Sequence, residues 1–219
     1  MPLSKFEKML PWSGLIAGLC WIGQTTLTKT DAKDAPGHSS TAVIHDNLVV
    51  NYAAVGCLVL MGIALLAFAT ASRNLLRSAE PGEATYSSVA YGAWIVVVAG
   101  LGQMVAWRWG MINGAADAED DAALHVLSYV GYFGFAAMGI GIATAFLATG
   151  LGGRRSAVLP RWFAITTVVL GVFSALGAAG VPPGGLVNYV LLPFWLMTAS
   201  VIIATRQKRA ATPPVLVSP

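Results

Sequence analysis

Long apolar stretches, separated by short polar segments, dominate the chain from residue 9 to residue 205. A helix that crosses a membrane needs about 20 mainly apolar residues. Six stretches reach that length, at residues 9–28, 48–71, 86–109, 122–149, 162–180 and 186–205. The pattern therefore predicts an all-α, polytopic membrane protein with a bundle of six transmembrane helices.

The composition supports this interpretation. Of the 219 residues, 56% are hydrophobic and 11% are charged, and the mean hydropathy is +0.69. Such a chain has too little polar surface to form a water-soluble globule. We expect residues 1–205 to form one six-helix transmembrane domain. The last segment, 206–219, is predicted to be a disordered cytoplasmic tail, because its prolines oppose a helix and it has little to bury.

Lys and Arg are divided unequally between the two sets of loops. One side has ten of them: Lys5, Lys8, Arg73, Arg77, Arg154, Arg155, Arg161, Arg206, Lys208 and Arg209. The other side has only Lys29, Lys33 and Arg108, together with most of the acids. By the positive-inside rule, both termini are expected in the cytoplasm, with the protein in a bacterial plasma membrane. The basic pI then reflects topology, and no nucleic-acid partner is expected.

The second predicted helix resembles the fourth when the two are aligned without gaps. In that alignment Tyr52 matches Tyr129, and Arg77 matches Arg154. The sixth helix opens with Asn188-Tyr189, as the second opens with Asn51-Tyr52. These matches suggest three related helical hairpins, an arrangement that can build a binding site between repeats. Chance agreement among Gly- and Ala-rich helices is the alternative.

The segment 154–177, RRSAVLPRWFAITTVVLGVFSALG, has an Arg-rich loop followed by Pro160, Arg161 and Trp162 at the start of the fifth helix. It resembles a loop and helix of uncharacterised six-helix integral membrane proteins of actinobacteria. The resemblance is confined to this segment. It implies no activity and assigns no functional residue.

Polar residues gather in the half of each helix that is predicted to face outward. Those expected to line a shared outward-facing pocket are Gln24, Asn51, Gln103, Arg108 and Asn188. No acidic, basic or histidine side chain is predicted near the bilayer centre, where a charge costs about 2.5–3.5 kcal/mol and usually serves coupling or conduction. Proton-coupled transport therefore lacks its usual carrier, and voltage sensing lacks its arginine ladder.

The fourth helix carries a second set of candidates. Asp121, His125 and Tyr129 are spaced four apart, so they share one helical face, and Asp46 begins the second helix in a similar setting. An acid paired with a histidine could serve as a proton donor. Ordinary capping of a helix start is the alternative for Asp121, because a carboxylate there is favoured by the helix dipole.

Deeper aromatic residues, including Trp94 and Trp195, could line an apolar cavity, although filling space between helices is their commoner role. Pro193 is expected to kink the sixth helix beside Trp195. Cys20 and Cys57 are predicted to be small buried hydrophobes, and a disulfide between them is possible. A metal held by His45, His125 and a carboxylate lacks a spacing motif, so we expect neither metal nor cofactor.

Three functions fit these residues. The first is an intramembrane isoprenoid (terpene) cyclase, an isomerase for a lipid-like substrate, in which an acid protonates the substrate and aromatic rings stabilise the carbocation. Asp46 or Asp121 would be the acid, oriented by His125 and Tyr129. Asn51 and Gln103 would hold the polar end of the substrate, and Trp94 and Trp195 would face the cation. The alternatives are a small transporter or permease and a non-catalytic membrane subunit that docks a partner.

Overall fold

The computed structural model describes residues 5–32, 35–80, 82–132 and 134–211, and nearly all of them are helical. The elements, in chain order, are α1 (Lys5–Met9), η1 (Leu10–Trp12), α2 (Ser13–Leu27), β1 (Asp31–Ala32), β2 (Ala35–Ser39), α3 (Thr41–Asp46), α4 (Leu48–Ala79), α5 (Thr85–Gly110), η2 (Met111–Ala115), α6 (Asp121–Tyr132), α7 (Phe135–Arg155), α8 (Arg161–Ala178), α9 (Gly184–Leu186), η3 (Val187–Leu191) and α10 (Leu192–Ala211). The two strands pair antiparallel as a short hairpin.

Five helical segments in the described part of the chain are long and apolar enough to cross a membrane. They are Leu48–Ala79, Thr85–Ala115, Asp121–Arg155, Arg161–Ala178 and Gly184–Gln207. A membrane protein is thus the natural interpretation of the fold. The first predicted span forms a helix as well, but α2 has only 15 residues, because Pro11 lies in a separate 3-10 turn before it.

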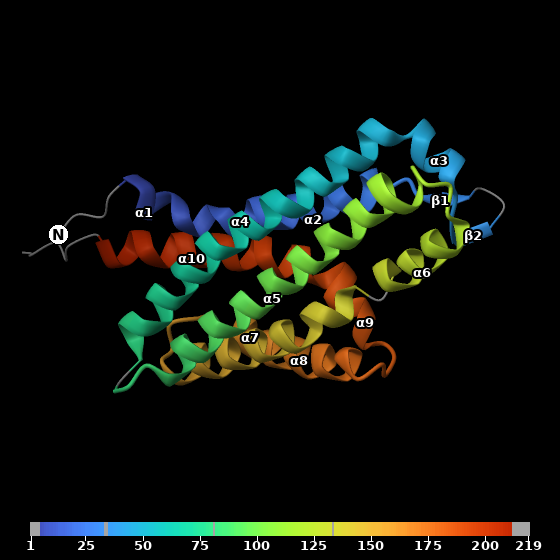
Figure 1. The fold of residues 1–219 in the computed structure, drawn as a ribbon. Helices are drawn as coiled ribbons and strands as arrows, with labels where there is room; N and C mark the ends of the chain where they lie inside the picture. The colour runs from blue at the N-terminus through green and yellow to red at the C-terminus, as the bar shows by residue number, and fades with distance from the viewer. Residues whose placement is uncertain (1–4, 33–34, 81, 133, 212–219) are drawn as a thin grey trace, which may run out of the picture.

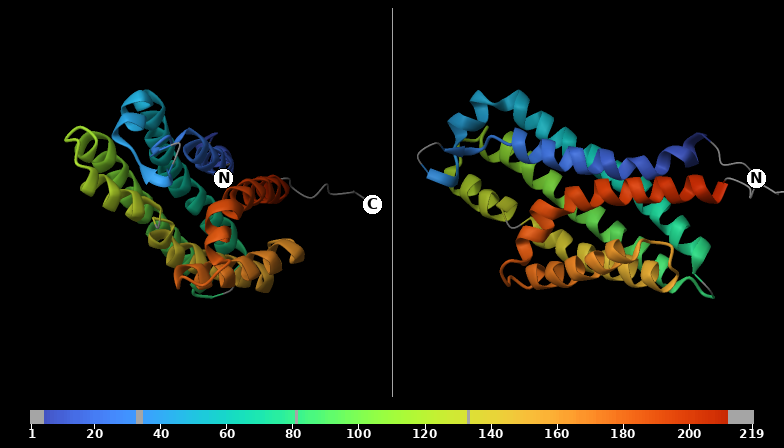
Figure 2. Two further views of the ribbon diagram at one scale, coloured as in Figure 1. Left: turned by 90° about the vertical axis from the view of Figure 1, so that its right-hand side faces the viewer. Right: turned by 180° about the vertical axis from the view of Figure 1, so that it is seen from behind.

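The helices pack as a nearly continuous series. α10 lies against α2, α2 against α4, α4 against α5, α5 against α7, and α7 against α8. The series closes where η3, at the start of the last helix, contacts both α7 and α8. From there α10 runs back beside α2, so its far end separates from α8 (Figure 1; Figure 2).

Close backbone approach explains where small residues stand in these interfaces. A Cβ at Gly141 of α7 would lie 2.9 Å from the carbonyl oxygen of Ala93 on α5. A Cβ at Gly18 of α2 would lie 2.7 Å from the carbonyl oxygen of Pro193 on α10. Both contacts require glycine, as expected where helices associate through packing in lipid.

The bundle has two distinct ends. At one end, which we call the cap (residues 28–32, 35–55 and 105–128), the hairpin, α3 and η2 gather around the ends of α4, α5 and α6 (Figure 1). The cap has its own cluster of buried apolar side chains, formed by Ile44, Val55, Met111, Ile112, Ala115, Ala116 and Leu124. The opposite end, which we call the arginine end, carries the arginines that terminate α4 and α7 and begin α8.

Three expectations need correction. The predicted helix 122–149 is divided into α6 and α7, with Gly134 as the N-cap of α7. The predicted hairpin repeats are not confirmed, since α4 is continuous where its counterpart is divided. α10 continues to Ala211, so residues 206–211 are helical because they extend an existing helix. The rest of the predicted tail, 212–219, lies outside the described residues.

Candidate functional site

The predicted acids lie on the surface of the cap. Asp46 is the last residue of α3 and Asp121 is the first of α6, and both are exposed. The neighbouring Asp120 accepts a hydrogen bond at Oδ1 from the backbone N–H of Ala123, at 3.0 Å. This is the capping arrangement that satisfies a free donor at a helix start. Asp120 therefore has a structural role at the start of α6.

His125 and Tyr129 contact each other on the exposed face of α6. Their ring centroids are 4.8 Å apart in an edge-to-face arrangement, and Tyr129 is 49% exposed. His45, the other histidine considered, has its Nε2 3.3 Å from the carbonyl oxygen of Ala116, which joins α3 to η2. Among the described residues, no group of three or more His, Cys, Asp or Glu side chains could hold a metal ion.

Asn51 has a structural task at the base of the cap. Its Oδ1 accepts a hydrogen bond from the backbone N–H of Lys29 at 2.9 Å, and its Nδ2 donates to the Lys29 carbonyl at 2.8 Å. The side chain is buried, so it holds the start of the hairpin loop against α4. Gln24 is also buried and donates to Thr25 Oγ1, whereas Gln103 is exposed on α5. These three predicted pocket residues therefore do not converge.

Trp94 and Trp195 lie at the centre of a packed aromatic cluster, with Phe68, Phe146 and Phe163. The centroid of the Trp195 ring is 5.8 Å from that of Trp94, 4.4 Å from Phe146 and 5.7 Å from Phe163. Trp94 is 0% exposed and Trp195 is 4% exposed. The rings fill the space between α4, α5, α7, α8 and α10, which is the packing alternative considered for them.

Arg108 and Asn188 occupy different surroundings near the cap. Arg108 follows Leu101 and Met104 on the buried face of α5, within electrostatic range of Tyr189 and Asp31. Asn188, in the π-helical turn η3, is fully buried, and neither its amide nitrogen nor its oxygen has a hydrogen-bond partner among the described residues.

The helix α8 carries a second buried polar side chain, Ser174. Trp195 Nε1 donates to Thr167 Oγ1 at 2.9 Å, which fixes the register between α10 and the antiparallel α8. Asn188 lies two helical turns before Trp195, and a Cβ built at Gly139 of α7 would lie 3.4 Å from the Asn188 Nδ2 and 2.9 Å from the Cβ of Ala178. Asn188 therefore lies near Ala178, which follows Ser174 by about one turn of α8. The Ser174 hydroxyl also lacks a described partner.

Trp21 has a role that the sequence analysis missed. Its indole Nε1 donates to the carbonyl oxygen of Tyr189 at 2.7 Å, and its ring meets the Tyr189 ring at 5.3 Å. Pro193 stands one helical turn after Tyr189 and has no N–H to offer that carbonyl. The indole donates to this carbonyl, and the bond joins α2 to the start of the last helix. The sequence shows Pro193, but it does not show which donor reaches the Tyr189 carbonyl.

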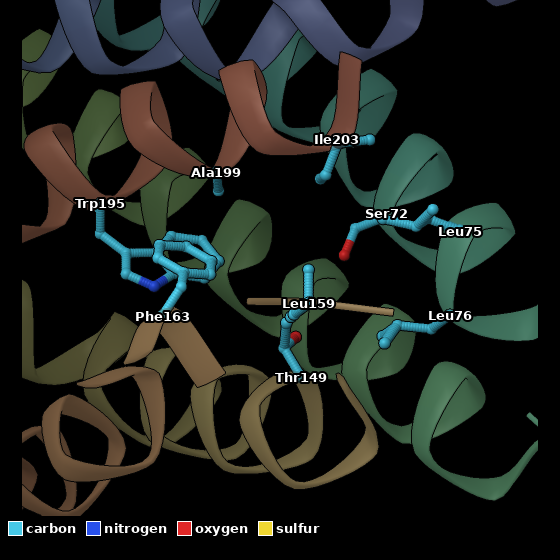
Figure 3. A pocket seen from close by; sticks show the side chains of 9 residues that line it. All are labelled: Ser72, Leu75, Leu76, Thr149, Leu159, Phe163, Trp195, Ala199 and Ile203. Atoms are coloured by element: carbon cyan, nitrogen blue, oxygen red, sulfur yellow. The ribbon is translucent and has the colours of Figure 1, made fainter. Parts of the chain in front are cut away.

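A crevice at the arginine end was not predicted either. Its empty space is about 250 Å³, counting the part open to the outside. Figure 3 shows the hydroxyl of Ser72 directed into it, with Thr149 on the opposite wall. The full lining is Ser72, Leu75, Leu76, Thr149, Leu159, Phe163, Trp195, Ala199 and Ile203.

A second hollow at the same end has an empty space of about 630 Å³, again counting the part open to the outside, and includes Glu80, Glu83, Tyr86 and Arg155. Glu80 accepts hydrogen bonds from the backbone N–H groups of Tyr86 at 2.6 Å and Ser87 at 3.1 Å, at the start of α5. Burial acts to raise the pKa of Glu80, but these hydrogen bonds and the charge of Arg77 outweigh it and lower the pKa below its ordinary value. Glu80 thus acts as an ionised hydrogen-bond acceptor for the first backbone N–H groups of α5.

Cys20 and Cys57 are free thiols, so the possible disulfide between them is not formed. Comparisons with protein families, curated proteins and solved structures find no match to the chain, so the arrangement of its residues is the available guide to function.

Proposed function

We propose that the chain is a non-catalytic, multi-pass subunit of a bacterial plasma membrane, which presents its cap outside the cell to a basic partner protein. In this arrangement the six helices span the membrane, α2 being the sixth, and both termini are cytoplasmic. The observation that carries the proposal is that the cap has its own hydrophobic cluster and exposes the acids grouped on it.

Helix lengths support a cap that projects from the bilayer. The α8 helix has 18 residues. A helix of this length spans roughly 27 Å, at a rise of about 1.5 Å per residue, which is close to the hydrocarbon thickness of about 30 Å. The cap extends past the ends of α8 and α9 along the bundle (Figure 1; Figure 2). A bilayer matched to α8 would leave the cap in water, with the arginine end at the cytoplasmic surface.

Charge supports a basic partner. The acids exposed on the cap are Asp31, Asp46, Asp117, Glu119, Asp120 and Asp121. The cap also exposes two large apolar side chains, Trp109 on α5 and Val126 on α6. Aromatic anchors surrounded by charge are typical of protein interfaces, and complementary charge speeds association.

The cyclase hypothesis has less support from this geometry. Its candidate acids Asp46 and Asp121 are exposed on the cap, whereas Trp94 and Trp195 are enclosed in the packed aromatic cluster. A protonating acid must reach the substrate that the aromatic wall surrounds. A small permease remains a second candidate, because buried unpaired polar groups at an irregular helix turn, as at Asn188, often mark transport sites.

The test is purification of the full chain from its native membrane after mild crosslinking. We expect a partner at fixed stoichiometry, lost in the triple variant Asp117→Asn, Glu119→Gln, Asp121→Asn and at high salt, but retained in Glu83→Gln, which removes an exposed acid at the opposite end. Asp120 is left unchanged because it caps α6. Cyclised product from farnesylated or geranylgeranylated acceptors, abolished by Asp46→Asn with Asp121→Asn, would overturn the proposal in favour of an enzyme.

A further inference from the structure

The second hollow at the arginine end lies where the connection between α4 and α5 meets the end of α7 (Figure 1). The two helices α5 and α7 touch within it, since a Cβ at Gly152 would lie 2.7 Å from the Cβ of Tyr86. Three of its side chains are exposed, those of Glu83, Thr85 and Arg155. The side chains that line the crevice, in contrast, are all buried. The hollow is therefore the cavity at this end that a ligand can enter from outside.

Both signs of charge line the hollow. The carboxylate of Glu80 accepts the backbone N–H groups of Tyr86 and Ser87. The carboxylate of Glu83 and the guanidinium of Arg155 form no hydrogen bond or ion pair with any described residue. Carboxylates accept hydrogen bonds from an ammonium group, and a guanidinium group pairs well with phosphate. The hollow is thus suited to a ligand that carries a cation and a phosphate close together.

The two helix walls become apolar one turn further into the bundle. On α5, the exposed Thr85 is followed four residues later by Val89, which is 45% exposed. On α7, Arg155 is preceded four residues earlier by Leu151, which is 44% exposed. Residues four apart share one face of a helix. Each wall therefore presents a polar group at the end of the bundle and an apolar group next to it, which favours an amphipathic ligand.

We propose that the hollow binds the headgroup of a phospholipid that carries a primary ammonium group beside its phosphate, as phosphatidylethanolamine does. The ammonium group donates to Glu83 and Glu80, the phosphate accepts from Arg155, and the acyl chains lie over Val89 and Leu151. The trimethylammonium group of phosphatidylcholine has no N–H to donate. Phosphatidylglycerol has no cation to place between its phosphate and the carboxylates. The site rests on the proposed placement of the arginine end at the cytoplasmic surface and needs no partner at the cap.

The test compares binding of these three lipids, with identical acyl chains, to the full chain in detergent by native mass spectrometry. We expect phosphatidylethanolamine to bind about tenfold more tightly than either of the others, as a charge-assisted hydrogen bond implies. Glu83→Gln should abolish this preference. Glu7→Gln, which removes an exposed acid of α1 outside the hollow, should retain it. The chain is measured without a partner, so the result is independent of binding at the cap.

Two further variants separate the headgroup from the acyl chains. Arg155→Gln should weaken all three lipids, because each of them has a phosphate. The double variant Val89→Ser with Leu151→Ser should also weaken all three and keep the preference for phosphatidylethanolamine. The thermal midpoint in lipid-free detergent reports folding of each variant. Equal binding of phosphatidylethanolamine and phosphatidylcholine, or an unchanged preference in Glu83→Gln, would overturn the proposal. So would binding of glycerophosphoethanolamine as tight as that of the intact lipid, which would indicate a site for a soluble zwitterion.

Discussion

The bundle and the cap have separate hydrophobic clusters, and they differ in how their buried polar groups are paired. In the bundle, Trp94 Nε1, Thr149 Oγ1 and both groups of Asn188 are buried without a described partner. In the cap, Asn51 pairs with the backbone of Lys29, and His45 meets the carbonyl of Ala116. Cap segments far apart in sequence are thus joined by hydrogen bonds to the backbone, although Thr41 Oγ1 in the cap has no described partner. The bundle has hydrogen bonds between helices as well, such as Trp195 to Thr167, but leaves more of its buried polar groups unpaired.

The proposed placement, with the bundle in lipid and the cap in water, accounts for this difference. A bundle in lipid gains little from the hydrophobic effect between its helices, so shape complementarity must provide much of its stability. A cap in water has few residues to bury, and its loops must also satisfy their backbone groups. We therefore expect large-to-small changes to affect the bundle most, and polar changes to act locally in the cap.

The largest effect is expected for Trp195→Ala. Trp195 contacts four other aromatic rings of the cluster and donates to Thr167. Removing such a buried ring lowers the free energy of unfolding by about 3–5 kcal/mol. Trp162→Ala is the matched control, because Trp162 is 60% exposed. Denaturant unfolding in detergent measures both, and an equal loss in the two variants would show that the cluster is not the main source of stability.

A smaller and more local effect is expected for Asn51→Ala. The variant leaves the Lys29 N–H and carbonyl without their side-chain partner, at a cost of about 1–3 kcal/mol. Hydrogen exchange should rise in the loop before β1 and remain low in α7 and α8. Asn113→Ala, which removes an exposed bond to Tyr52, is the control. Faster exchange throughout the bundle would mean that the cap and the bundle unfold together.

Most of the helices could be predicted from the sequence, because apolar length is a direct physical requirement of a membrane span. The bounds of the helices were predicted less accurately than their presence. The division between α6 and α7, the hairpin and the continuation of α10 to Ala211 all depend on contacts or local geometry that hydropathy does not report. His125 and Tyr129 do contact each other, since a spacing of four fixes neighbours within one helix.

The shared pocket could not be predicted in the same way. Asn51, Gln103 and Asn188 were grouped by depth along their helices, but depth does not fix the direction in which each side chain points. Asn51 turns to Lys29, Gln103 is exposed, and Asn188 faces the α7–α8 side. The crevice at Ser72 was missed for a related reason, because a gap depends on how neighbouring helices diverge.

The hydrogen bond from Trp21 to the Tyr189 carbonyl is expected to contribute about 1 kcal/mol to the free energy of unfolding. Trp21→Phe retains a ring but removes the donor, and should lower the free energy of unfolding by that amount. Pro193→Ala restores a backbone N–H one helical turn after Tyr189, so the same Trp21→Phe change should cost less in that background. The double-mutant cycle measures the coupling, and strictly additive effects would contradict the assignment.

The smallest effect concerns Glu80, an acid that is used structurally, in contrast to those exposed on the cap. Its folded-state pKa is lowered below the ordinary 4.5, despite the opposing effect of burial, by hydrogen bonds from the start of α5 and by Arg77. A lowered pKa stabilises the fold fully above the ordinary value, and the contribution is lost as the pH falls through the folded-state pKa. The thermal midpoint of the native chain should therefore exceed that of Glu80→Gln at about pH 7, and the difference should shrink towards about pH 3. The triple variant of the cap acids should show no comparable pH-dependent difference. If the difference in thermal midpoint between the native chain and Glu80→Gln stays constant across this range, a charged Glu80 at the start of α5 is ruled out.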